Sequence, residues 1–531
     1  MLKIREKQMN FNDTDYLCSR LIPENNFYRK FREIVEPLLK DEVFSSMYSA
    51  DNGRPAISPA LLSMATILQF YRNLTDREME RACMYDLEIK YALRLRVDDR
   101  PFDHSSLGDF RKRLLAHGKE KEIFDRILNK LVESGLIKRN EIQRIDATHV
   151  IADVAVPTMI TLVKKCTREV LKSLKGQQKH IYKTLESKVD LEKYTRETVN
   201  KTDAGKEDVE KRKIKLLEVV TDAREVLKSV SKMNASRVLR KKVDLLKRIM
   251  QENLIEDENG HPVEMENKKK PKNILVSPID EDARYGAKSK TKRFVGYKAN
   301  ITESVENRII TNIKAMGGNR RDGDDMVEMV KEQKRYGLSP MKIVGDTAYS
   351  DGKYRQELKE ENVQVVAPLR ISNGQTKDVF PKRMFKYDEQ SQKLTCPQRV
   401  QTEASWMDSQ KQIKVFHFPM SVCQSCKVFR KCTKSKEGRR TVGISMVNTE
   451  LREAESYNQT EEFKNDMKLR PMVEGKLSEL VRYHGMRRSR YRGLGKLNLQ
   501  CYFTATAVNI KRWFKLLEDQ LKPDKEIQFS F

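Results

Sequence analysis

The stretch QRIDATHVIADV, residues 143–154, decides the fold. Its apolar and β-branched residues predict an extended strand. The first of its two acidic residues, Asp146, follows Ile142 and Ile145. The strand therefore predicts a position from which an active-site carboxylate can be displayed.

Two further acids lie in comparable settings far along the chain. Asp346, in MKIVGDTAYSDG at 341–352, terminates a short buried strand. Glu474, in KLRPMVEGKLSELV at 468–481, lies on a predicted helix. The apolar stripe of that helix is formed by Leu469, Val473, Leu477, Leu480 and Val481.

Two carboxylates on strands and one on a nearby helix can hold a pair of divalent metal ions about 3.5–4 Å apart, an arrangement that performs in-line displacement at phosphorus. Each acid also has an ordinary structural reading. Asp at a strand end commonly forms a turn or caps a helix. Arg470 precedes Glu474 by one helical turn, so a plain salt bridge is the alternative there.

Several phrases follow one another along the chain in an order that resembles a known family. They are GRPAISPALL (53–62), FDHSSLGDFRKRL (102–114), DATHV (146–150), KRFVGYKAN (292–300), VGDTAYSD (344–351), RPMVE (470–474) and HGMRRSRYRGLGK (484–496). The chain resembles bacterial insertion-sequence transposases of the Asp-Asp-Glu (DDE) type, whose catalytic domain is similar to ribonuclease H and retroviral integrase. It departs from many relatives in carrying Met467 and Val481 where they have Tyr and Lys.

The resemblance implies that Asp146, Asp346 and Glu474 are catalytic and bind two Mg²⁺ or Mn²⁺ ions. One ion would activate water or a DNA 3′-hydroxyl, and the other would stabilise the leaving 3′-oxygen. The expected function is cleavage at the ends of an insertion sequence and strand transfer into target DNA, with a homodimer in the synaptic complex. A metal-dependent nuclease without strand transfer is one alternative. A non-catalytic DNA-binding regulator derived from a transposase is another.

Composition agrees with a nucleic-acid partner. The chain has 531 residues, which suggests about three domains. Its formal net charge of +27 favours a polyanion such as double-stranded DNA, here the terminal inverted repeats and the target. No apolar run approaches the roughly 20 residues that span a bilayer, and the N-terminus lacks the apolar core of a signal peptide. We therefore expect a cytoplasmic, nucleoid-associated protein without a membrane partner.

Basic residues cluster near the proposed chemistry, where they would neutralise DNA phosphates. The alternative is a solvated basic face. The predicted DNA-binding residues are Lys288, Lys290, Arg293, Lys298, Arg470, Arg482, Arg487, Arg488 and Arg490.

The order of patterns predicts an α/β protein. Residues 1–140 read as a helical DNA-binding domain, in which Thr75 and Glu78 form a capping box and a further helix after Ser105 and Ser106 carries a basic exposed face at 111–113. A helical bundle without DNA contact is the alternative. Strand-like runs at 273–277, 294–301, 308–315, 343–345 and 363–369, with a helix over 323–336, predict a mixed sheet.

The resemblance implies that this sheet is a ribonuclease-H-like core. The predicted division assigns 141–160 and 271–375 to the core and 161–270 to a charged helical insertion. Residues 376–445 form a Cys-rich insertion, and 446–531 complete the core with the helix of Glu474. The helical insertion would clamp DNA, contact a second copy, or simply be solvated.

Four cysteines, Cys396, Cys423, Cys426 and Cys432, lie between the second and third acids. Disulfides are rare in the cytosol, and a C-x₂-C pair with two more thiols nearby suits a structural Zn²⁺ with four thiolate ligands. Four unrelated thiols are the alternative. Basic residues around them suggest that this insertion touches DNA.

Overall fold

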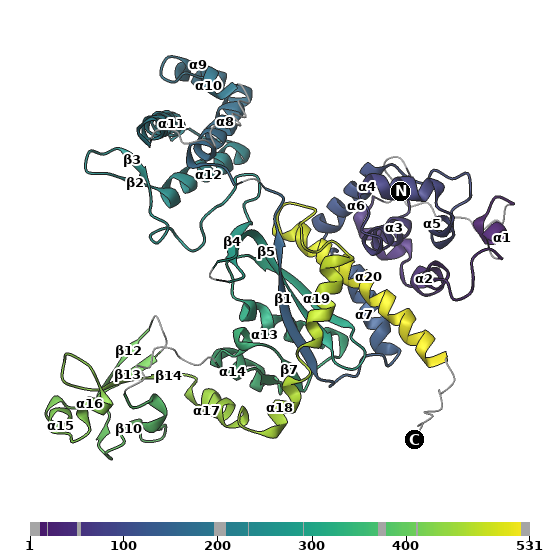
Figure 1. The fold of residues 1–531 in the computed structure, drawn as a ribbon. Coiled ribbons are helices and arrows are strands. Elements are labelled where there is room, and N and C mark those ends of the chain that lie inside the picture. The colour runs from purple at the N-terminus through teal and green to yellow at the C-terminus, as the bar shows by residue number, and fades with distance from the viewer. Residues whose placement is uncertain are drawn as a thin grey trace, which may run out of the picture.

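The computed structural model describes residues 11–521 apart from 19, 50–54, 155, 196–208, 232, 290, 370–378 and 410–412. It is a mixed α/β structure in which helical and β-rich lobes surround a central sheet (Figure 1). The strands of this sheet run in the order β4-β5-β1-β7-β8, with β6 paired to β5. The α/β expectation is therefore confirmed.

The middle of the sheet combines antiparallel and parallel pairs. Strand β1 (Gln143–Ile151) is antiparallel to β5 (Arg293–Ser304) and parallel to β7 (Lys342–Val344). Strand β8 (Gln364–Val366) continues the parallel part at one edge. On the other side, β5 pairs with both β4 (Arg284–Ala287) and β6 (Ile310–Gly317).

Most of the predicted strands are confirmed, but the run at 273–277 is not a strand. Ile274, Leu275 and Val276 are buried, yet the backbone forms a turn and Leu275 N donates to Glu252 Oε2 at 2.8 Å. Leu275 belongs to the hydrophobic core of the helical lobe, so burial rather than sheet pairing accounts for this residue. The predicted helix over 323–336 is present as α13 (Met326–Gln333), with a 3₁₀ turn at each end.

The N-terminal part of the chain is helical, and the Thr75–Glu78 capping box is confirmed. Helix α6 starts at His104 rather than after Ser106, because Asp103 caps it through Ser105 N. The described helices are α1 (Thr14–Cys18), α2 (Phe27–Val35), α3 (Pro59–Tyr71), α4 (Asp76–Tyr85), α5 (Leu87–Ala92), α6 (His104–Ala116) and α7 (Glu122–Glu133).

The basic face expected on α6 is wrong in one residue. Arg111 is buried, its Nη2 donates to Asp76 at 2.5 Å, and its guanidinium lies over the ring of Tyr491. Arg111 therefore fastens α6 to α4 and to the C-terminal part of the chain. Lys112 and Arg113 remain exposed.

Helices follow β1 as predicted and enclose a hydrophobic core of their own. They form the lobe at the top of Figure 1, together with the hairpin of β2 (Leu254–Glu256) and β3 (Pro262–Glu264). The helices are α8 (Met159–Gln177), α9 (Lys179–Glu186), α10 (Glu192–Thr195), α11 (Val209–Val230) and α12 (Arg237–Asn253).

The cysteine-containing lobe consists of two small antiparallel sheets and two short helices. Its elements are β9 (Lys386–Asp388), β10 (Lys393–Thr395), β11 (Gln401–Thr402), β12 (Ser405–Asp408), β13 (Ile413–His417), α15 (Met420–Gln424), α16 (Phe429–Cys432) and β14 (Thr441–Ser445).

The chain then returns to the sheet through four helices, α17 (Asn448–Tyr457), α18 (Glu461–Met467), α19 (Met472–Arg482) and α20 (Leu494–Leu521). Helix α19 packs on β1, and α20 packs on β6, α3 and α7. The last helix thereby joins the sheet to the N-terminal helices in one hydrophobic core.

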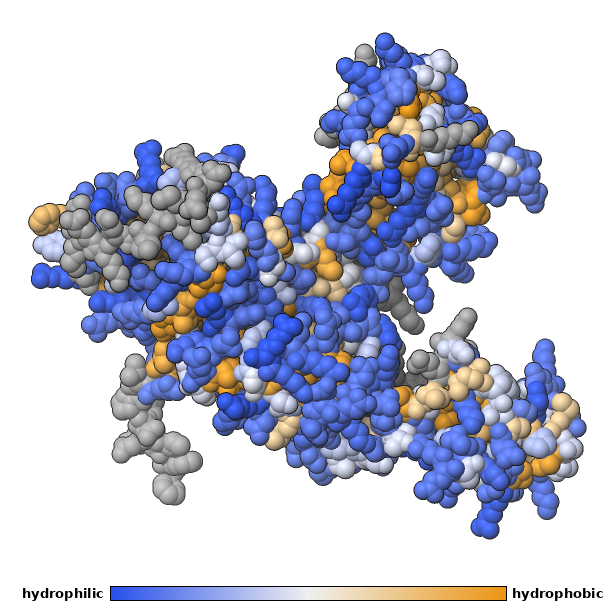
Figure 2. Space-filling model, turned by 180° about the vertical axis from the view of Figure 1, so that it is seen from behind, coloured by the Kyte–Doolittle hydropathy of each residue, from blue (hydrophilic) through white to orange (hydrophobic). Residues whose placement is uncertain are grey.

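Hydrophilic side chains dominate the face shown in Figure 2, with hydrophobic residues in scattered patches. Among the helices that the structure describes, none combines the length and apolarity needed to cross a membrane.

Candidate active site

Asp146 and Asp346 lie at matching positions on neighbouring parallel strands. The β1–β7 register pairs Gln143 with Ile343 and Arg144 with Val344, so each aspartate lies two residues beyond the last pair. Asp346 then caps a 3₁₀ turn (Thr347–Tyr349) by accepting a hydrogen bond from Ala348 N at 2.8 Å. Asp346 therefore caps a turn, as the structural alternative expects, and it also lies near Asp146.

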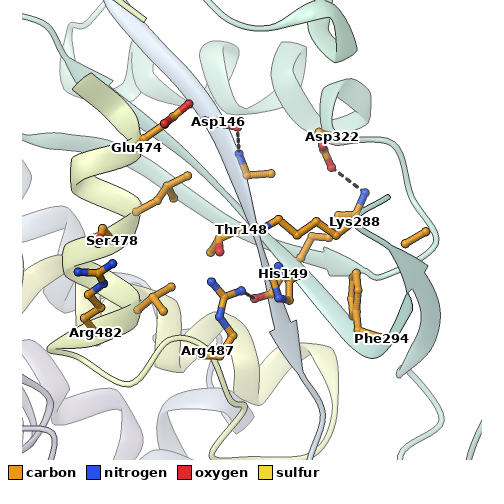
Figure 3. Close-up of a pocket in the computed structure, with 15 residues that line it drawn as sticks. Asp146, Thr148, His149, Lys288, Phe294, Asp322, Glu474, Ser478, Arg482 and Arg487 are labelled. Atoms are coloured by element: carbon orange, nitrogen blue, oxygen red, sulfur yellow. Dashed lines mark hydrogen bonds and ion pairs between the residues drawn. The ribbon is translucent and has the colours of Figure 1, made fainter. Parts of the chain in front are cut away.

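Glu474 comes from the first turn of α19 and points toward the strand that carries Asp146 (Figure 3). The guanidinium of Arg470 lies between these two acids. Its nitrogens are 3.4 Å from Asp146 Oδ2 and 3.2 Å from Glu474 Oε1. The salt bridge considered from the sequence is present, and it extends to a second carboxylate.

Asp146 and Glu474 border a cleft of about 530 Å³, whereas Asp346 and Arg470 are not among its lining residues. One wall is built from β1 and β5 and the other from α19. The lining residues that carry charge or a hydroxyl are Asp146, Thr148, His149, Lys288, Lys298, Asp322, Glu474, Ser478, Arg482 and Arg487.

Negative charge accumulates at the end of the cleft that holds Asp146. Burial, with smaller contributions from the neighbouring carboxylates of Asp346 and Asp322, raises the pKa of Asp146 to about 6, against the opposing effects of the Ala147 N–H and Arg470. The fully buried phenol of Tyr349 also has a raised pKa, chiefly from burial and then from the same three aspartates. Asp146, Asp346 and Asp322 are therefore close enough to influence one another's charge.

Sequence reasoning missed Asp322, although it lies in a conspicuous acidic run, RRDGDD at 320–325. Its Oδ1 is 2.7 Å from Lys298 Nζ. Asp322 was missed because an acidic run before a helix normally suggests capping. The long-range pairing of β5 with β1 brings this loop to the cleft.

The acids of the cleft do not form a closed ligand cage. Within the described part of the chain, only Glu80, Asp103 and His104 have three candidate ligand atoms all within 4.8 Å of one another. Hydrogen bonds of α6 account for that trio, since Glu80 accepts from His104 N and Asp103 from Ser105 N. In the cleft, Arg470 instead separates Asp146 from Glu474.

Several of the predicted DNA-binding residues lie in or beside the cleft. Lys288, Lys298, Arg482 and Arg487 line it. The guanidinium of Arg487 also donates to His149 O at 2.7 Å. Arg293 and Arg488 are exposed on neighbouring backbone, at the start of β5 and beside Ile151. Lys290 lies outside the described residues.

Arg490 is placed differently, because its guanidinium is used inside the protein. It donates to Leu74 O at 2.7 Å and to Asn73 Oδ1 at 2.5 Å, and it lies over the ring of Phe70. Burial lowers its pKa. These contacts join the segment after α19 to the N-terminal helices, so they speak against the predicted phosphate contact.

The four cysteines lie around one pocket of about 370 Å³. Cys426 N donates to Cys423 O, and Cys396 O accepts from Arg399 N, so both segments turn back on themselves. Burial raises the pKa of Cys432, which Arg440 opposes and the other three thiols reinforce. The four cysteines, all of them within the described residues, therefore line one pocket, although no three of their sulfur atoms lie within 4.8 Å of one another.

Comparisons with known families matched two regions of the chain. The description "Transposase domain (DUF772)" matches residues 17–113, which include α2 to α5 and most of α6. The description "Transposase DDE domain" matches residues 395–514, which include Glu474 and the four clustered cysteines. Neither curated proteins nor solved structures gave a match. Together, the two matched regions and their order indicate that the chain is an insertion-sequence transposase of the DDE type.

Proposed function

We propose that this transposase cuts DNA at the ends of its insertion sequence and joins them to target DNA, using Asp146, Asp346 and Glu474 on a ribonuclease-H-like core. The observation that carries the proposal is the cleft, where an acidic end next to Arg470 adjoins a wall of basic side chains. An acidic centre beside a basic track suits a reaction at a phosphodiester whose neighbouring phosphates need neutralisation.

The residues present fit divalent ions. Carboxylate oxygens are the ligands that Mg²⁺ and Mn²⁺ prefer. Two further carboxylates, Asp346 and Asp322, lie close enough to Asp146 to raise its pKa, in addition to the larger effect of burial. We propose that Asp146, Asp346 and Glu474 hold two such ions, and that the ions would displace Arg470 from between Asp146 and Glu474. Bound, the ions would supply Lewis-acid stabilisation of the leaving oxygen and an acidified nucleophile.

The protein's own contribution is to hold the DNA strand. Lys288, Arg482 and Arg487 extend from both walls of the cleft and would bind phosphates on either side of the scissile bond. Arg293 and Arg488 would extend this track outside the cleft. Arg470, once freed from Glu474, would be available to a phosphate. Such positioning contributes to the rate because the reacting atoms are held in line.

Further roles follow from the other lobes. We propose that residues 1–140 bind the terminal inverted repeats, that 161–270 clamp DNA or contact a second copy, and that the active form is a homodimer pairing two ends. Residues 376–445 would hold one structural Zn²⁺ through the four cysteines around their shared pocket. Action on double-stranded DNA places the protein in the cytoplasm, at the nucleoid.

A labelled-end assay tests the function. The DNA flanking the coding region is first sequenced for matched inverted repeats, and a labelled duplex carrying one repeat is incubated with protein, Mg²⁺ and a target plasmid. We expect nicking at the repeat boundary and label joined to the plasmid. Cleavage without joining would favour the nuclease alternative, and binding without cleavage would favour the regulator.

A further inference from the structure

A fourth carboxylate, Asp322, borders the same cleft as Asp146 and Glu474 (Figure 3). The other two aspartates of the RRDGDD loop pair with residues that do not line the cleft. Asp324 accepts a hydrogen bond from Tyr354 Oη at 2.8 Å, and Asp325, which is buried, pairs with Arg320 at 3.0 Å. Asp322 is thus the aspartate of this loop that lines the cleft.

A buried network fixes the backbone of Asp322 relative to the strands of the proposed catalytic acids. Tyr349 Oη donates to Asn300 Oδ1 at 2.9 Å, and Asn300 Nδ2 donates to Asp322 O at 2.7 Å. Tyr349 follows Asp346 in the same turn, and Asn300 lies opposite Ala147 on the neighbouring strand. A fully satisfied polar network of this kind rigidifies what it connects.

The loop also packs directly on the segment that follows Asp346. A Cβ atom at Gly323 would lie 2.7 Å from Ala348 O and 2.7 Å from the Tyr354 ring, so the close approach requires glycine. The position of Asp322 is therefore set from two directions, and not by its ion pair alone.

Asp322 pairs with a protein cation, as Asp146 and Glu474 pair with Arg470. Lys298 Nζ lies 2.7 Å from Asp322 Oδ1 and 2.8 Å from Arg320 O, and its side chain lines the cleft. Lys298 and Arg470 are both flexible basic side chains beside carboxylates, and two of these carboxylates, Asp322 and Asp146, also influence each other. An ammonium group can be displaced by a divalent ion, because the ion offers the carboxylate a higher charge.

We propose that Asp322 is a fourth carboxylate of the metal site and that Lys298 is the cation that a divalent ion would displace from it. Metal binding would release Lys298 toward a DNA phosphate. This inference rests on the proposed function, because it assumes divalent ions between Asp146 and Asp346.

Mn²⁺ binding to the full chain tests this directly, since free Mn²⁺ is measured by electron paramagnetic resonance without any catalysis. Asp322→Asn should weaken binding of at least one ion by about tenfold or more. Lys298→Met should strengthen it severalfold, because the competing cation is gone. Glu328→Gln, which removes one acid paired with Lys314 outside the cleft, should bind like wild type.

Unchanged Mn²⁺ binding by a folded Asp322→Asn protein would overturn the inference. If that variant does not fold, unchanged or weaker binding by Lys298→Met would overturn it instead. Wild-type binding that depends on Asp146 but not on Asp322 would leave the proposed function standing. Absence of Mn²⁺ binding by the wild type would overturn both.

Discussion

At the scale of single residues, Glu479 contrasts with Glu474 on the same helix. It is 3.1 Å from the buried Lys476 and 2.8 Å from Lys511. Burial alone would raise its pKa, but the two ammonium groups outweigh burial and lower the pKa to about 2. The pKa of Lys476 is lowered as well, because burial dominates there, so this ammonium depends on its acidic neighbours to stay charged.

This ion pair predicts a pH dependence of stability. A carboxyl whose folded pKa is depressed stabilises the protein above its unfolded value of about 4.3, and the stabilisation is lost as pH falls toward 2. We expect Glu479→Gln to lower stability at pH 7 by about 2 kcal/mol and to reduce the loss of stability between about pH 4.5 and 2. Thermal melts of wild type and Glu479→Gln across this pH range check the prediction. Identical dependence of the melting temperature on pH in the two proteins would contradict it.

Arg490 and Arg487 are close in sequence, but we expect their substitutions to have different effects. Arg490→Ala removes hydrogen bonds to Leu74 and Asn73 and a contact with the Phe70 ring. We expect a stability loss of about 2 kcal/mol, seen as a lower melting temperature. Arg487→Ala removes one hydrogen bond, to His149 O, so it should lower the melting temperature less than Arg490→Ala does and should bind DNA less tightly. A larger stability loss in Arg487→Ala together with weaker DNA binding only in Arg490→Ala would contradict these roles.

At the scale of elements, α19 and the segment after it should bind the DNA backbone. Replacing Arg482 and Arg487 with Ala should weaken binding to all DNA sequences similarly and reduce the slope of log affinity against log salt by about 1 per lost phosphate contact. Arg335→Ala with Lys353→Ala removes the same charge from exposed positions away from the cleft and is the control. Loss confined to one DNA sequence would instead indicate base reading.

The cysteine lobe predicts a structural metal. Purified protein should contain about one zinc per chain, and Cys426→Ser should lose it and destabilise this lobe. Cys501→Ser, at a buried cysteine of α20, should keep the zinc and is the control. Zinc-free wild type with an intact lobe would mean that four unrelated thiols share the pocket.

Helices and strands were predicted correctly from the sequence where a local pattern of residues determines the structure. The Thr75–Glu78 capping box and the strands β5 to β8 lie close to where their patterns indicate. The prediction failed at 273–277, where Leu275 is buried in the hydrophobic core of the helical lobe and does not pair in a sheet. Periodicity alone does not separate these two causes of an apolar run.

At the scale of the whole molecule, the candidate site is assembled from distant segments. Strand β1, strand β7 and helix α19 meet although the helical and cysteine lobes are inserted between them. Spacing along the chain did not predict this meeting; the family resemblance did. Asp322 was missed for the same reason, since only tertiary contacts bring it to the cleft. Tertiary contacts also give the guanidinium of Arg490 its hydrogen-bond partners at Leu74 and Asn73.

The central claim is that Asp146, Asp346 and Glu474 act together as metal-binding catalytic residues. The most direct measurement is nicking and strand transfer of a labelled element end by Asp146→Asn, Asp346→Asn, Glu474→Gln and the triple variant, with DNA binding measured in parallel. Asp153→Asn is the control, because this exposed acid pairs with Arg492 outside the cleft.

We expect each single variant to fold, to bind DNA, and to lose both reactions nearly as completely as the triple variant, because residues that act as one unit are strongly non-additive. The control should retain activity. A fully active Glu474→Gln protein would contradict the account, since the third carboxylate would then lie elsewhere.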